Sequence, residues 1–237
     1  MTDDEINNTA GALQSRLHDQ LVSLLHYPHP FCDDGFVVIF KDDVKEVVDL
    51  IAEAYSCTGP ETHVYCLRHG ELFELSLPVY SWLNIVNRHT LMVYWLKHKG
   101  EVLFGRDIRD ELALPQDPRL LLENHLAVCG HFLRSGVILD WLQRRRYREL
   151  IGKLGRQARI LMATALLLRG EWETTEETVA ARFEQLFSDP LLKQLWGDYK
   201  LLMQGVPATG EDAGRDSAFE AVWLFEGFVR RLRVYTV

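Results

Sequence analysis

The spacing of apolar residues changes near Pro115, and this change constrains the fold more than any other feature of the chain. Before it, short β-rich runs such as Gly35–Phe40 alternate with segments whose apolar residues recur at helical spacing. After Pro118 the apolar residues keep the helical period, and no segment has strand character. The sequence therefore predicts an α/β domain over residues 1–115, followed by an all-α helical bundle over residues 116–237.

The first domain is expected to contain helices and strands in alternation. The segment from Val22 to Tyr27 fits either the end of the first helix or a short strand. Asp42 or Asp43 is expected to cap the second helix, and Gly70 lies in the turn of an expected hairpin. The predicted helices cover residues 6–24, 44–55 and 79–98, and the predicted strands cover residues 35–40, 63–67 and 72–77.

The second domain is expected to consist of helices alone. Thr174 and Glu177 have the spacing of a capping box, which marks the start of one of them. The predicted helices cover residues 119–134, 137–151, 154–169, 175–187, 190–203 and 217–234.

Composition narrows the classes of function. The net charge of −8 disfavours general attraction to nucleic acid or anionic membranes, because phosphate binding needs surplus Lys and Arg. No apolar run approaches the roughly 20 residues of a membrane span, and the N-terminus is acidic where a secretory signal is basic. The four cysteines are scattered, which is typical of reduced thiols. We therefore expect a cytoplasmic protein with no membrane partner.

The closing segment Val102-Leu103-Phe104-Gly105-Arg106-Asp107 follows a strand, a helix, a hairpin and a further helix. That order, with that ending, resembles the catalytic domain of the nucleotidyltransferase family. The helical half, including residues 165–172, is similar to the bundle of kanamycin-type nucleotidyltransferases. The resemblance implies an α+β fold class: a nucleotidyltransferase-like mixed sheet with flanking helices, followed by the helical bundle.

In that family a Gly-Ser turn holds the triphosphate, an Asp-x-Asp pair binds two metal ions, and a later strand supplies a third carboxylate. Here Asp33 matches the first metal-binding position and Gly35 the second. The third carboxylate maps best to Glu74, with His63 as the alternative. For an active enzyme the resemblance implies Mg²⁺ and a nucleoside triphosphate as cofactors, and otherwise none. It implies Asp33 and Glu74 as catalytic residues, and Asp33, Asp34 and Glu74 as metal ligands.

The match departs from the family at both halves of the site. Gly35 offers no side chain, and Asp34 would point to the opposite face of a strand from Asp33. Pro28 and Pro30 have no backbone N–H groups with which to cradle phosphate. The sequence therefore predicts an eroded two-metal site. The competing interpretation is that Asp33 and its neighbours form an ordinary turn before a strand.

Basic residues gather at residues 144–148 and continue to Arg159. Arg145 and Arg148 on this segment, with Arg106, are the candidate phosphate-binding residues, and Tyr147 could stack on a base. We expect Arg144 and Arg148 to share one face of a single helix. The alternative is that these charges form a solvated face or pair with acidic residues elsewhere in the chain.

Three hypotheses follow. The leading one is a nucleotide-binding or partner-binding protein without efficient transfer activity, with a homodimer packed through helices. The second is an active nucleotidyltransferase that moves a nucleoside monophosphate to a hydroxyl of a small molecule or protein. The third is RNA binding through the basic helix.

Overall fold

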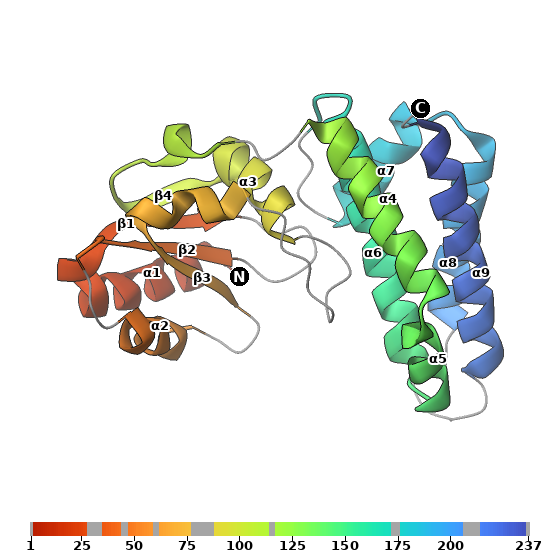
Figure 1. Ribbon diagram of the computed structural model, residues 1–237, viewed down its shortest axis with the longest axis horizontal. Helices are drawn as coiled ribbons and strands as arrows, with labels where there is room; N and C mark the ends of the chain where they lie inside the picture. Colours follow the sequence, from red (N-terminus) through yellow and green to blue (C-terminus); the bar gives the residue numbers. More distant parts are fainter. Residues whose placement is uncertain are drawn as a thin grey trace. The chain divides into compact units, whose positions relative to one another are not determined.

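The computed structural model describes residues 2–27, 35–43, 47–58, 62–76, 88–113, 117–171, 176–205 and 214–235. These residues form two compact units, one ending at residue 113 and the other beginning at residue 117 (Figure 1). The N-terminal unit contains a sheet with helices, and the described part of the C-terminal unit contains helices without strands.

The sheet of the N-terminal unit has the strand order β3-β2-β1-β4 (Figure 1). Strand β1 pairs antiparallel with both of its neighbours, whereas β2 and β3 are parallel. Strands β2, β3 and β4 therefore run in the same direction, and their carboxyl ends meet at one edge of the sheet. The strands are β1 (Leu21–Tyr27), β2 (Gly35–Phe40), β3 (His63–Arg68) and β4 (Glu101–Gly105).

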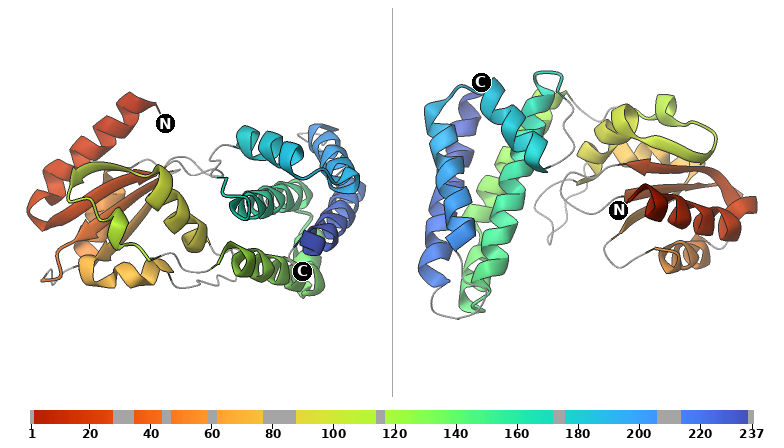
Figure 2. Two further views of the ribbon diagram at one scale, coloured as in Figure 1. Left: turned by 90° about the horizontal axis from the view of Figure 1, so that it is seen from above. Right: turned by 180° about the vertical axis from the view of Figure 1, so that it is seen from behind.

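Helices cover both faces of this sheet, as Figure 2 shows. Helices α1 (Asp3–Leu17) and α2 (Val47–Ser56) pack on one face, where the core includes Phe36, Val38 and Phe40 of β2. Helix α3 (Arg88–Lys99) packs on the other, against Val37 and Ile39. Both faces of β2 are buried, which fits the absence of polar residues from this strand.

The structure decides two points that concern residues 21–27 and the expected hairpin. Residues 21–27 form a strand, because β2 and β4 supply hydrogen-bonding partners on both sides. The expected second strand of the hairpin is wrong, since His69–Ser76 forms a 3₁₀-helix, η2. Its first turn is held by side chains: Glu71 accepts the backbone N–H of Arg68 at 2.8 Å, and Asp42 accepts that of Gly70 at 2.6 Å.

The C-terminal unit is built around one central helix, α6. The described side chains of α6 from Ile160 to Leu167 are all buried, so this stretch is enclosed on every side, and α6 contacts α4, α7 and α9. No helix in the described ranges is both long and apolar enough to cross a lipid bilayer. The helices are α4 (Pro118–Arg134), α5 (Gly136–Gln143), α6 (Tyr147–Leu167), α7 (Glu176–Leu186), α8 (Pro190–Gly205) and α9 (Arg215–Leu232).

The break between α5 and α6 lies earlier than the sequence predicts. Helix α5 ends at a Schellman motif, in which the N–H of Arg146 bonds to the carbonyl of Trp141 and that of Arg145 to the carbonyl of Leu142. Arg145 takes the left-handed conformation that this motif requires, with φ 56°. The predicted helices 137–151 and 154–169 are therefore replaced by a short α5 and a continuous α6. Thr174, the expected cap of α7, lies outside the described residues.

Candidate functional site

The start of β2 is where the sequence places the metal site. Gly35 is the first residue of β2, and the sheet register puts Tyr27 of β1 on one side of it and His63 of β3 on the other. Asp33 and Asp34, two of the expected metal ligands, lie outside the described residues. The described part of this end of the sheet consists of the starts of β2, β3 and β4 and the end of β1, where His26 pairs with Glu101.

The ring of Tyr27 occupies the space beside Gly35. A Cβ added at Gly35 would overlap the ring carbons of Tyr27 and lie 2.6 Å from its hydroxyl oxygen. Tyr27 has no exposed surface and packs in the core with Val37 and Ile39. A side chain at position 35 therefore has no room while Tyr27 keeps its place. The sequence shows the glycine but gives no sign of the ring, because the pairing of β1 with β2 sets their contact.

The neighbouring strand does not supply the third carboxylate. Strand β3, from His63 to Arg68, contains neither Asp nor Glu, and its register places His63 beside Gly35. Glu74 lies in η2, so its assignment to a strand is wrong. The backbone register thus favours His63, the alternative, as the residue of β3 next to the start of β2.

Arg106 lies at the opposite edge of the sheet from Gly35. Its backbone N–H bonds to the carbonyl of Val22 at 3.0 Å, and the preceding Gly105 pairs with Ser23. Strand β2 begins at Gly35 and ends at the edge where Arg106 lies, so its full length, roughly 17 Å at about 3.3 Å per residue, separates the two positions. Arg106, a candidate phosphate-binding residue, therefore lies far from Gly35 along the sheet.

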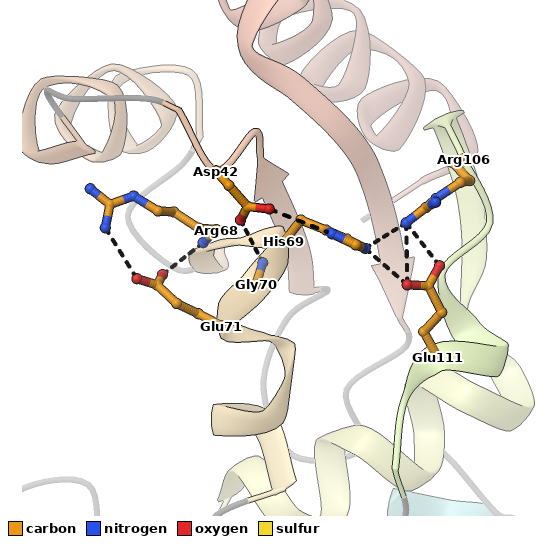
Figure 3. Close-up of polar contacts among 7 residues, drawn as sticks. All are labelled: Asp42, Arg68, His69, Gly70, Glu71, Arg106 and Glu111. Atoms are coloured by element: carbon orange, nitrogen blue, oxygen red, sulfur yellow. Dashed lines mark hydrogen bonds and ion pairs between the residues drawn. The ribbon is translucent and has the colours of Figure 1, made fainter.

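Arg106 instead belongs to a polar group at the carboxyl edge of the sheet, which we call the strand-end cluster (Figure 3). It consists of Asp42 after β2, His69 after β3, Arg106 after β4, and Glu111 in the 3₁₀-helix η3 (Arg109–Glu111). Arg106 Nη2 lies 2.9 Å from Glu111 Oε1, and His69 Nε2 lies 2.9 Å from Glu111 Oε2. Asp42 Oδ2 is 3.9 Å from His69 Nδ1.

One ring nitrogen of His69 lies near two partners. Nε2 is 2.5 Å from Arg106 Nη2 and 2.9 Å from Glu111 Oε2. A guanidinium can only donate hydrogen bonds and a carboxylate can only accept them, so the position of the ring proton decides which of the two His69 bonds. In either case His69 connects the end of β3 to the residues that follow β4.

The strand-end cluster can tie three strand ends together. Its side chains are between 28% and 61% exposed, so each ion pair is worth little on its own. Nearby, hydrogen bonds from Arg109 lower the pKa of Asp107 to about 2. The described ranges contain no group of three or more His, Cys, Asp or Glu side chains that could hold a metal ion. The sequence signal that could have found the cluster is the polar residues directly after each parallel strand.

The basic segment of the C-terminal unit has acidic and aromatic partners. Arg144 pairs with Asp140 at 2.9 Å, and Arg146 pairs with Glu149 at 3.5 Å. Lys153 lies 3.9 Å from the centre of the Trp141 ring, a cation–π contact. The alternative interpretation, pairing with acidic residues, therefore describes much of this segment.

The candidate phosphate-binding residues of this segment do not share a helix face. Arg144 and Arg145 end α5, whereas Arg148 is exposed in the first turn of α6, so the expectation of one continuous helix is wrong. Tyr147 is half-buried, and its Cβ would lie 3.0 Å from a Cβ added at Gly214. Tyr147 is therefore packed within the unit instead of presenting a free ring.

Comparison with known proteins supports the fold. No protein family and no curated protein matches the sequence. Among solved structures, the chain is similar to spectinomycin adenyltransferase AAD(9) from Enterococcus faecialis, solved with ATP and spectinomycin. The identity is 15%, the match covers 95% of this chain and 100% of that one, and the TM-score is 0.53. The nucleotidyltransferase-like fold expected from the sequence is thereby confirmed, with its mixed sheet, flanking helices and helical C-terminal part.

Proposed function

We propose that this chain uses a nucleotidyltransferase-like fold to bind a nucleotide or a protein partner, and that it does not transfer nucleotidyl groups efficiently. The observation that carries the proposal is the ring of Tyr27 packed against Gly35. Two-metal transfer needs several carboxylates that converge on the ions, because Mg²⁺ prefers hard oxygen ligands in octahedral geometry. At the start of β2 the second ligand position has neither a carboxylate nor space for one.

The neighbouring strand strengthens this proposal. A metal pair could be retained if β3 contributed extra oxygen ligands, but β3 has no acidic residue. Asp33, Asp34 and Glu74 remain the candidate ligands from the sequence, and any metal bound by them would lack the family's arrangement on two adjacent strands. Reduced charge stabilisation of the reacting phosphate follows from that loss.

The ligand to test first is a nucleoside triphosphate, because the structural neighbour was solved with ATP. Among the candidate phosphate-binding residues, Arg106 pairs with Glu111 and Arg145 completes the end of α5. Arg148 is exposed in the first turn of α6 and remains a candidate from the sequence.

The test combines binding with turnover. Calorimetric titration with ATP and GTP, with and without Mg²⁺, measures binding. Radiolabelled nucleotide with a panel of small-molecule and protein acceptors measures transfer. We expect no robust transfer, and a nucleotide affinity that changes little when Mg²⁺ is removed. Turnover that disappears in Asp33→Ala would instead establish the active enzyme, the alternative that the similarity to an adenyltransferase favours.

A designed pair of variants addresses the missing ligand directly. Tyr27→Ala with Gly35→Asp supplies a carboxylate and the space for it, and Tyr27→Ala alone is the matched control. If the eroded ligand position is what limits metal binding, Mg²⁺-dependent nucleotide binding should increase in the double variant only. Cooperative thermal unfolding of both variants checks that they remain folded.

A further inference from the structure

The outward face of α9 carries two large aromatic side chains. Phe219 is 49% exposed and Trp223 is 66% exposed. The opposite face of the same helix packs against α4, α6 and α8 (Figure 1). The residues of that buried face are Ala218, Ala221, Leu224, Phe225, Phe228, Val229 and Leu232.

A charged residue lies at each end of this aromatic face. Asp216, Trp223 and Arg230 follow one another at intervals of seven residues. Seven residues make almost two full turns, so each of the three points within about 20° of the next around the helix axis. Asp216 lies in the first turn of α9 and Arg230 in the last. We call these three residues, with Phe219 beside them, the α9 stripe. It has an acidic end, an aromatic centre and a basic end.

We propose that the α9 stripe binds the α9 stripe of a second copy of this chain, with the two helices antiparallel and Trp223 at the two-fold axis. In that arrangement the residue seven positions before Trp223 faces the residue seven positions after it in the other copy. Asp216 of each copy therefore faces Arg230 of the other, and the symmetry forms this ion pair twice. A parallel arrangement would instead place Asp216 against Asp216 and Arg230 against Arg230.

The remaining charges of α9 do not oppose the antiparallel arrangement. Viewed down the helix axis, Glu220 and Glu226 lie about 60° from Trp223, on opposite sides of it. The antiparallel two-fold places the Glu220 side of one helix against the Glu220 side of the other. Glu220 of one copy therefore does not meet Glu226 of the other. Arg215 and Arg231 are separated in the same way. Within one copy Arg215 lies over the ring of Phe219 and Arg231 bonds to Asp189 at 2.5 Å. Arg230 bonds to Glu226 of its own copy at 2.5 Å, so in the dimer it would lie between that carboxylate and Asp216 of the other copy.

The contact between the two Trp223 side chains at the centre of the interface should contribute most to the binding free energy. Trp is among the residue types that most often dominate binding energy, and it does so near the middle of an interface where water is excluded. The two ion pairs at the rim add orientation more than affinity. This proposal does not depend on whether the chain binds nucleotide or transfers it.

The test is the mass of the full-length chain in solution across a wide range of concentration, by light scattering and sedimentation. We expect a concentration-dependent dimer. Trp223→Asp should weaken association by more than tenfold. Leu139→Asp, at an exposed apolar residue of α5, is the matched control and should not change the mass.

Charge exchange distinguishes the antiparallel pairing from other dimers. Asp216→Arg and Arg230→Asp should each weaken association, because each places like charges opposite one another. The variant that carries both changes should recover it, because the pair is restored with its charges reversed. A chain that is monomeric at every concentration overturns the proposal, as does a dimer that is insensitive to Trp223→Asp or is not recovered by the double change.

Discussion

At the scale of single residues, the contact between Gly35 and Tyr27 decides what the start of β2 can hold. When a glycine lies opposite an aromatic residue in an antiparallel pair, the ring can lie across the glycine backbone. The ring then covers the backbone that the glycine leaves without a side chain. Gly35 is therefore a packing position.

Gly35→Ala should lower the free energy of unfolding by about 1–3 kcal/mol, because the added methyl group overlaps a fully buried ring. The measurement is urea denaturation followed by circular dichroism. Gly11→Ala in α1 is the control, since nothing lies within 4 Å of its Cβ position, and it should stabilise by up to about 1 kcal/mol. Equal effects of the two changes would show that Tyr27 does not fill this space.

A second residue-scale prediction concerns His125 in the core of the C-terminal unit. Its Nδ1 lies 3.0 Å from Thr164 Oγ1, whose own proton bonds to the carbonyl of Ile160 at 2.8 Å. Nδ1 must therefore carry the proton of a neutral ring. Burial lowers the pKa of His125 from 6.5 to about 3. Between these two values the unfolded chain binds a proton that the folded chain does not.

Stability should therefore be unaffected by His125 above pH 6.5 and should fall as the pH drops from 6.5 towards 3, by roughly 1 kcal/mol per pH unit. His125→Leu should flatten this part of the curve of unfolding free energy against pH. His131→Leu, at an exposed position of the same helix, is the control and should leave the slope unchanged. An unchanged slope in His125→Leu would mean that the buried ring does not resist protonation.

At the scale of elements, local hydrogen bonds fix two boundaries. Helix α5 stops at a Schellman motif although its left-handed position holds Arg145 and not Gly. The start of η2 is fixed by Glu71 and Asp42, which accept backbone N–H groups that a strand would have directed to a neighbour. Backbone hydrogen bonds thus end α5, and side-chain hydrogen bonds end β3 at the start of η2. The spacing of apolar residues sets neither boundary.

Arg145→Gly should raise the free energy of unfolding by about 1 kcal/mol, because glycine adopts the left-handed conformation without the steric cost that Arg145 incurs. Arg144→Gly is the matched control one residue earlier. Its backbone is not left-handed, so it should give no gain. Thermal and chemical denaturation of the two variants provide the comparison, and a loss of stability in Arg145→Gly would contradict the prediction.

At the scale of the whole molecule, each unit has the means to fold on its own. The sheet of the N-terminal unit is covered on both faces, and the C-terminal unit surrounds α6. We infer that these units are separate domains, and the boundary near residue 115 remains a prediction from the sequence.

A fragment of residues 117–237 should therefore be helical and unfold cooperatively when expressed alone. Its core depends on contacts of α6 with α4, α7 and α9, all of which the fragment retains. Circular dichroism and calorimetry make the measurement, and Leu161→Asp, which buries a charge in α6, should abolish the transition. A fragment without a cooperative transition would show that the bundle needs the N-terminal unit.

The sequence by itself determined the division into a mixed unit and a helical unit, the buried strand β2 and the lack of a carboxylate at Gly35. These are local properties, because the period of apolar residues and the identity of a side chain need no partner. Only the tertiary structure decided that residues 21–27 form a strand and that Tyr27 fills the space at Gly35. It also decided that Arg106 joins His69 and Glu111, far from the start of β2. Each of these depends on the pairing of segments distant in the chain, which no local pattern specifies.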